Sequence, residues 1–187
     1  MFAGASLDEN SGAFCELKAN FFRLILTKAE LLAITKADIN FEKNQLNIDK
    51  TYYRTGKKDV ITEPKTKQSV RIIEIPGFLK KEIQEFVDRH YGMADTQRLF
   101  PVVQEAVQHK MKRQIKVAGV KKIRVHDLRH SHVAYLIEKG VEPLLIKERL
   151  GHKDIRITLN TYGHLYPNQQ RKVANLLDEE NQIDAIK

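Results

Sequence analysis

Four side chains in the carboxyl-terminal third of the sequence have types and an order suited to phosphoryl chemistry. They are His126, Arg129, His152 and Tyr162, in the stretches VHDLRHSHVAYLIEKG, IKERLGHKD and ITLNTYGHLYP. A tyrosine hydroxyl, with a pKa of ~10, attacks phosphorus only when cations offset the charge growing on the non-bridging oxygens. An arginine can bind two such oxygens, and histidines can donate hydrogen bonds or relay protons. The set predicts phosphodiester cleavage that needs no metal ion.

Basic residues are concentrated in two segments. The 187-residue chain has a net charge of +8, and residues 108–130 hold eight Lys and Arg against one acid. Residues 54–71 hold six against two, so the rest of the chain is slightly acidic. Such segments can simply form a solvated surface, or they can bind a polyanion such as double-stranded DNA. The candidate DNA-binding residues are Lys65, Arg71, Lys110, Lys112, Arg113, Lys121, Lys122 and Arg124.

Composition argues against several other classes of protein. No run approaches the ~18 apolar residues that a membrane-spanning helix needs, so no membrane partner is expected. The single cysteine, Cys15, rules out an internal disulfide and a four-cysteine zinc site. No leader-like segment is recognised at the amino terminus, and a cytoplasmic location is the default expectation.

The elements that position these residues follow from hydrophobic periodicity. After a poorly defined entry at 1–20, helical spacing over 21–37 predicts one or two helices. Segments at 45–53, 58–63 and 70–75 are rich in Ile, Val, Thr and Tyr and predict a three-stranded antiparallel sheet with a turn near 55–58. Further helices are predicted at 78–91, 102–118, 127–139, 143–150, 154–163 and from 167 to about 180. The expected fold is mainly α with a small antiparallel sheet (α+β).

In their order, these motifs resemble the carboxyl-terminal catalytic domain of tyrosine recombinases, especially integrases of phages and conjugative transposons. H-D-L-R-H is followed by L-G-H and by T-x-x-T-Y-x-H. The resemblance extends upstream through RLFP, the hairpin KTYYRTGKKDVITEPKTKQSVRIIEIP and ELLAITKADINF, and so covers residues 21–166. It implies a site-specific recombinase in which Tyr162 forms a 3′-phosphotyrosyl link and frees a 5′-hydroxyl. Arg129 would bind the scissile phosphate, while His126 and His152 would donate hydrogen bonds and handle protons.

The resemblance carries further implications for the site and its partners. The hairpin lysine that protonates the leaving oxygen would be Lys67, with Lys65 as the second choice. Tyr166 is a less favoured nucleophile, and His164 is expected to be a structural partner. Because bond energy is kept in the phosphotyrosine, no cofactor is implied. A homo-oligomer, a tetramer on two duplexes, is implied, and the helix or tail at 167–187 would pack on its own core or on a neighbouring protomer.

One residue of the family pattern is not found. The first catalytic arginine lies in a pattern like T-G-x-R-x-x-E-L-L-A-L, whereas this sequence reads R-L-I-L-T-K-A-E-L-L-A-I. Either Thr27 stands at the arginine position, or a G-x-R triplet is missing between Thr27 and Lys28. A deletion, an omitted segment and a substitute role for Arg23 are the explanations, and an omitted segment fits best because both flanks match. If the deletion is real, the phosphate loses one guanidinium and the rate falls by ~10²-fold or more, so such a chain is expected to bind DNA and cleave it poorly. From the length of 187 residues we expect a catalytic domain without the amino-terminal DNA-binding modules of such integrases.

Two other functions compete with this one. His126 and His130 are four residues apart and lie near His132, but the glutamate of an H-E-x-x-H zinc motif is lacking. A non-catalytic DNA-binding protein is the stronger rival, because GVEPLLIKERLGHKDIRIT resembles helix-turn-helix spacing. It ranks second, since such a protein has no need of all four residues in family order.

Overall fold

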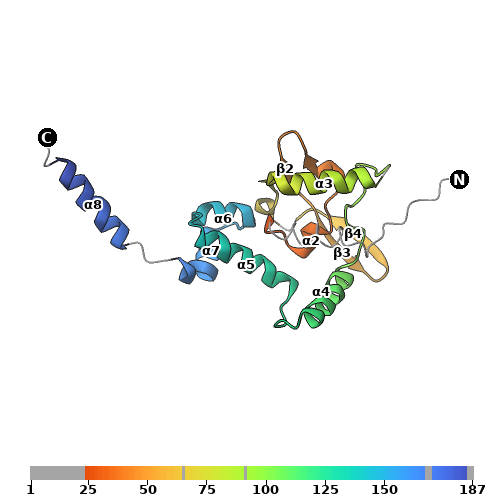
Figure 1. Cartoon of the computed structure of the whole chain (residues 1–187). Coiled ribbons are helices and arrows are strands. Elements are labelled where there is room, and N and C mark those ends of the chain that lie inside the picture. Colours follow the sequence, from red (N-terminus) through yellow and green to blue (C-terminus); the bar gives the residue numbers. More distant parts are fainter. Residues whose placement is uncertain (1–23, 65, 91, 167–169, 185–187) are drawn as a thin grey trace.

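Figure 1 shows the computed structural model, which describes residues 24–64, 66–90, 92–166 and 170–184. The amino-terminal elements are α2 (Lys28–Leu31), the 3₁₀ turn η2 (Lys36–Asp38), β1 (Ile39–Asn40), β2 (Gln45–Ile48), β3 (Thr51–Thr55), β4 (Lys58–Thr62), η3 (Lys67–Ser69) and β5 (Arg71–Glu74). The remaining elements are α3 (Gly77–Arg89), α4 (Gln104–Ala118), α5 (Val125–Glu138), α6 (Pro143–Leu150), α7 (Ile155–Tyr162), η4 (Gly163–Leu165) and α8 (Gln170–Asp184). The predicted fold class, mainly helical with small antiparallel sheet structure, is confirmed. The predicted entry at 1–20 lies outside the described residues.

The strands form two small antiparallel sheets, which corrects the prediction of a single sheet built from three longer strands. One sheet has the order β1-β2-β5, and the other contains only β3 and β4. The hairpin β3–β4 closes on itself through a two-residue turn in which Gly56 has φ +60°, a conformation that glycine adopts without strain. Most of its side chains are exposed, and only Tyr52 is fully buried. It therefore has no continuous apolar face with which to extend the other sheet.

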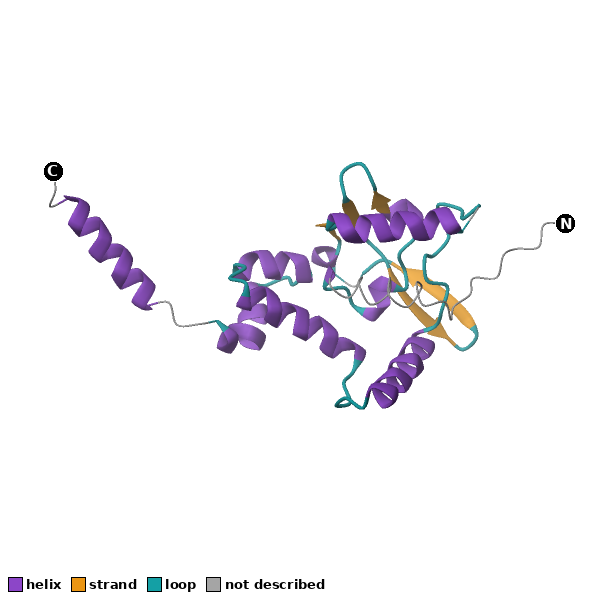
Figure 2. Ribbon diagram, viewed as in Figure 1, coloured by secondary structure: helices purple, strands orange, loops and turns teal. Residues whose placement is uncertain are grey.

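Two apolar clusters hold the described residues together. The larger one joins α2, the three-stranded sheet and α3, and the smaller one joins α5, α6 and α7. Figure 2 shows those three helices on one side of the molecule and the strands on the other. Leu24 and Leu26 belong to the larger cluster, whereas Ile25 between them belongs to the smaller one. The segment at 24–26 thus links the two clusters.

That link explains why the predicted helices over 21–37 are mostly absent from the described part of this range. Ile25 is fully buried and has φ +62°, a left-handed conformation that is rare for a β-branched residue and incompatible with a continuing helix. The helix α2 begins only after Thr27, whose side chain accepts a hydrogen bond from the backbone N–H of Glu30 while the Glu30 carboxylate accepts one from the backbone N–H of Thr27. The apolar residues of this range are therefore spaced as in a helix because they are buried in two different clusters, and most of them are not in a helix.

The later helices end close to where the sequence predicts. α4 ends at Gly119 and α6 at Gly151, both left-handed, and Pro143 opens α6. The side chain of Asp154 caps α7 by accepting from the backbone N–H of Arg156. α5 begins at 125, two residues before its predicted start, so that His126 lies in its first turn.

The last helix, α8, lies apart from the other elements (Figure 1). Its side chains Val173, Leu176 and Leu177 are each more than half exposed. They share one helical face because they are three and four residues apart. None of the described helices is long and apolar enough to cross a bilayer.

Candidate active site

Tyr162 ends α7 inside the smaller apolar cluster. Its side chain is 5% exposed, and its Oη lies 2.6 Å from Nδ1 of His130 on α5. The ring of His130 in turn meets the ring of His126 edge-on, with centroids 4.6 Å apart. Burial raises the pKa of Tyr162, while the charge of Arg129 acts in the opposite direction. The hydroxyl is therefore protonated at neutral pH and hydrogen-bonded within the site.

Arg129 is held inside the protein by backbone carbonyls. Its Nη2 donates to the carbonyl of Leu150 at 2.8 Å, and its Nη1 donates to the carbonyl of Ile25. Glu30 Oε2 lies 3.9 Å from Nη1. Burial lowers the pKa of Arg129 to about 10, so the guanidinium remains charged at neutral pH. These contacts fix one orientation of a cation beside the tyrosine.

His152 lies in the turn between α6 and α7. Its Nδ1 is 3.0 Å from Oγ1 of Thr158, which is fully buried. Burial and then the charges of Arg129 and Arg71 lower the pKa of His152 to about 4. The imidazole is therefore neutral at pH 7 and retains one N–H donor.

His126, by contrast, faces outward from the first turn of α5. Its side chain is exposed. Burial, followed by the charges of His130 and Arg129, still lowers the pKa of His126. Thus the charge of Arg129 acts on His126, His152 and Tyr162, and the structure places these three side chains around one guanidinium.

Arg71 occupies a different environment from the one expected for a surface DNA contact. Its Nη1 lies 2.7 Å from Glu30 Oε1, and its Nε donates to the carbonyl of Arg149 at 2.8 Å. The side chain is only 7% exposed. A Cβ on Gly151 would stand 3.1 Å from Arg71 Nη1, so this glycine permits the close approach. Arg71 is accordingly an internal cation, paired with the same carboxylate that lies near Arg129.

Glu30 is the carboxylate shared by the two arginines. Burial alone would raise the pKa of Glu30, but the hydrogen bond and charge of Arg71, the backbone of Thr27 and the charge of Arg129 together lower it. The sequence interpretation assigned Glu30 no role. Its position in the family stretch E-L-L-A, three residues after the place of the missing arginine, is the sequence feature that could have pointed to a role.

The other predicted residues do not join this group. Lys67 is exposed in η3, and Lys65 and Arg23 lie outside the described residues. On α4 and the loop that follows it, Lys110 is half-buried, and the exposed members are Lys112, Arg113, Lys121, Lys122 and Arg124. Arg124 forms an ion pair of 2.9 Å with Asp127. These cations therefore lie on an outer surface that leads into α5.

His130 is the contact that the sequence interpretation missed. It considered this residue only as a metal ligand with His126 and His132. In the structure, the ring of His132 stacks on Tyr135, whereas His130 contacts Tyr162. Among the described residues, no three His, Cys, Asp or Glu side chains gather as metal ligands.

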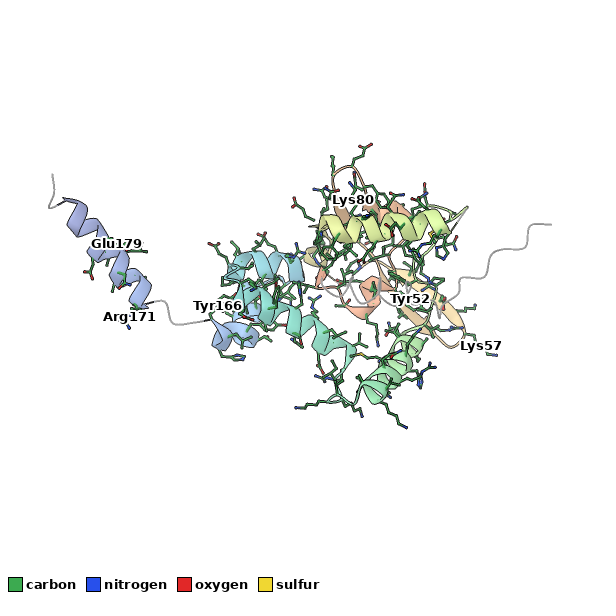
Figure 3. The ribbon with its side chains drawn as sticks, viewed as in Figure 1. Tyr52, Lys57, Lys80, Tyr166, Arg171 and Glu179 are labelled. Atoms are coloured by element: carbon green, nitrogen blue, oxygen red, sulfur yellow. The ribbon has the colours of Figure 1, made fainter. Side chains whose placement is uncertain are left out.

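Tyr166, the less favoured nucleophile, is half-buried, and its Oη has no described hydrogen-bond partner. Its ring packs beside the smaller cluster at the end of α7 (Figure 3).

Comparison with known proteins decides the family. Residues 22–169 match the model of the phage integrase family. The chain belongs to this family. It is 35% identical over 163 residues to the ICEBs1 integrase of Bacillus subtilis (strain 168), across 80% of this chain and 44% of that protein. It is 29% identical over 169 residues to a putative prophage phiRv2 integrase of Mycobacterium tuberculosis, across 85% of this chain and 45% of that protein. The chain thus spans about half the length of these family members.

Solved structures of family members share the fold. The Tn1549 transposon integrase, in complex with a circular intermediate DNA, matches with a TM-score of 0.73 and 21% identity over 92% of this chain and 60% of that one. The catalytic domain of bacteriophage HP1 integrase matches with a TM-score of 0.57 and 19% identity over 89% of this chain and 83% of that one. The predicted resemblance to tyrosine recombinases is therefore confirmed at the level of family and fold.

Proposed function

We propose that this chain is the catalytic domain of a site-specific DNA recombinase, which cleaves and rejoins strands through a 3′-phosphotyrosyl intermediate at Tyr162. The observation that carries the proposal is the placement of the Tyr162 hydroxyl among His126, His130 and the charged Arg129. A site built only to hold duplex DNA has no use for a buried hydroxyl beside a fixed guanidinium. A nucleophile that attacks a phosphodiester needs both.

The proposed reaction begins when Arg129 binds the scissile phosphate. Two backbone carbonyls already orient its guanidinium, and its remaining N–H groups can donate to non-bridging oxygens. Neutral His152 donates one hydrogen bond to the phosphate, with Thr158 donating to its Nδ1. Exposed His126 supplies another donor from the first turn of α5. Such donors matter most as negative charge grows on the phosphate.

Bond making and breaking then exchange one ester for another. The Tyr162 oxygen bonds to phosphorus, and the bond from phosphorus to the 5′-oxygen breaks. We assign protonation of that oxygen to Lys67, or to Lys65, on the segment between β4 and β5. Lys67 is exposed in η3 and does not contact the side chains around Arg129 and Tyr162 in the structure. This role therefore requires the segment to move toward them when DNA is bound. Rejoining reverses the sequence with a different 5′-hydroxyl.

Exposed cations on and after α4 supply the proposed grip on the duplex. They are continuous along the chain with α5, whose first turns carry His126 and Arg129. Phosphate contacts of this kind position the duplex without reading its sequence. A homo-oligomer on DNA belongs to the same proposal, with the exposed apolar face of α8 as the contact between protomers.

A nicked suicide substrate tests the function directly. Once cleavage releases a short strand, rejoining fails and the covalent protein–DNA adduct accumulates. We expect the chain to form this adduct in excess chelator and Tyr162→Phe to form none, with Tyr166→Phe as the matched control. Duplex binding without adduct would favour the helix-turn-helix alternative. Equal adduct from Tyr162→Phe would overturn the assignment of the nucleophile.

A further inference from the structure

We propose that His130 is a catalytic residue, whose Nδ1 accepts the proton of the Tyr162 hydroxyl as that oxygen attacks phosphorus. The inference rests on the strand-transfer function proposed above and assigns it a general base. His130 contacts the reacting atom itself, because its Nδ1 lies 2.6 Å from Tyr162 Oη. That separation is within the range in which a general base takes a proton directly.

The geometry favours His130 over its neighbour His126. The rings of His130 and Tyr162 have centroids 5.6 Å apart, with the two residues on the facing helices α5 and α7. His126 meets His130 edge-on and is more exposed, on the side of α5 toward solvent. His126 is thus free to face the phosphate while His130 faces the nucleophile. The two imidazoles, four residues apart on one helix, have separate tasks.

The surrounding charges fit this division. The groups that face His130 are Tyr162 on α7, and His126 and Asp127 on its own helix. Asp127 is a carboxylate that attracts a protonated His130. A charged His130 also disfavours a charge on His126. When His130 takes the proton, His126 therefore stays neutral and keeps its ability to donate a hydrogen bond to the phosphate.

The proton transfer balances within the reaction. The O–H bond of Tyr162 breaks as its oxygen bonds to phosphorus, and the proton moves to Nδ1 of a His130 whose other nitrogen, Nε2, carries hydrogen. The leaving 5′-oxygen receives a different proton from the lysine proposed above. Rejoining returns the His130 proton to the departing tyrosine oxygen. No oxidant, cofactor or metal ion enters the step.

His130→Asn removes the base while keeping an acceptor. The asparagine oxygen can occupy the place of Nδ1 and accept from Tyr162, but it cannot hold the proton. General bases contribute typically ~10²–10⁴-fold, so we expect adduct formation to slow by at least ~10²-fold. We also expect the rate of the unaltered chain to depend on pH and this dependence to be weaker in the variant, because the asparagine cannot hold a proton. His132→Asn is the matched control, since its ring lies against Tyr135.

A spectroscopic measurement tests the contact without relying on catalysis. With ¹³Cζ-labelled tyrosine, Tyr162→Phe identifies the Tyr162 resonance. The position of that resonance should change in His130→Asn, which alters the group 2.6 Å from the Tyr162 hydroxyl, and should be unchanged in His132→Asn. An unaltered chain that forms adduct, beside a His130→Asn variant with the same rate and pH profile, would overturn the inference and leave the proposed function intact. A Tyr162 resonance whose position is the same in the unaltered chain and in His130→Asn would overturn the inference as well. Absence of adduct from the unaltered chain refutes both proposals.

Discussion

Glu30 and Arg71 form an ion pair of 2.7 Å in which both side chains are only 7% exposed. The pair joins α2 to the start of β5, which are 41 residues apart in the sequence. The same carboxylate lies 3.9 Å from Arg129. Glu30 therefore compensates the charge of two buried cations and links β5 to the proposed catalytic arginine.

Glu30→Gln should destabilise the protein strongly. The substitution leaves Arg71 buried without its carboxylate, and removing one partner of a buried pair costs about 3–5 kcal/mol. Urea unfolding measures this decrease in stability. Glu85→Gln, on the exposed face of α3, is the control and should change the free energy of unfolding by less than about 0.5 kcal/mol. Similar effects of the two substitutions would contradict a structural role for the Glu30 pair.

His152 should make stability depend on pH on the acidic side. Its pKa is lowered from 6.5 to about 4 in the folded protein. Between these values the unfolded chain binds a proton that the folded chain does not, so stability falls as pH decreases through this window. His152→Asn should remove that part of the slope, as measured by urea midpoints at several pH values. Parallel profiles for the two proteins would contradict the assigned shift.

Replacing Arg98 by lysine should lower the stability of the protein. Its Nη1 lies 3.1–3.4 Å from the carbonyl oxygens of Leu32, Phe100 and Val102. Its Nη2 donates to Asp59 at 2.9 Å, and the guanidinium stacks on the ring of Tyr52 at 4.3 Å. A lysine cannot reproduce this planar set of contacts, so Arg98→Lys should lower the free energy of unfolding by about 2–3 kcal/mol. Arg89→Lys on exposed α3 serves as the control in the same urea titration.

The cations of α4 should govern the salt dependence of DNA binding. Lys112→Gln and Arg113→Gln should each weaken duplex binding and reduce the slope of log K against log salt by ~0.9 for each phosphate that the protein no longer neutralises. Fluorescence anisotropy at several salt concentrations measures the slope. Lys80 projects from α3, on the side away from α4 (Figure 3), so Lys80→Gln should leave the slope unchanged. An equal decrease in affinity for all three variants would indicate a nonspecific effect of net charge.

Restoring the family arginine should accelerate cleavage. Insertion of Gly-Leu-Arg between Thr27 and Lys28 recreates the T-G-x-R order, next to the segment whose Ile25 carbonyl binds Arg129. One recovered transition-state donor should raise the single-turnover rate of adduct formation by ~10²-fold or more. An inserted Gly-Leu-Ala is the matched control for the change in length. Equal rates for the two insertions would show that the guanidinium is not what the site lacks.

Local sequence signals were sufficient for the later helices and for membership in the family. Glycines at 119 and 151 adopt the left-handed conformation that ends a helix, and Pro143 opens one. Such ends depend on the conformational limits of single residues, so they can be predicted without knowledge of the fold. The order of His126, Arg129, His152 and Tyr162 likewise required only the chain itself.

Tertiary packing decided what those residues contact. Arg71 appears in the sequence as one more cation of a basic hairpin, yet it lies inside against Glu30. His130 appears as a second histidine of a helix, yet it meets a tyrosine 32 residues away. Periodicity identifies which face of an element is apolar but not which partner will cover it. The partners of Arg71, His130 and Tyr162 were therefore set by how two apolar clusters close around residues 24–26, which only the three-dimensional arrangement determines.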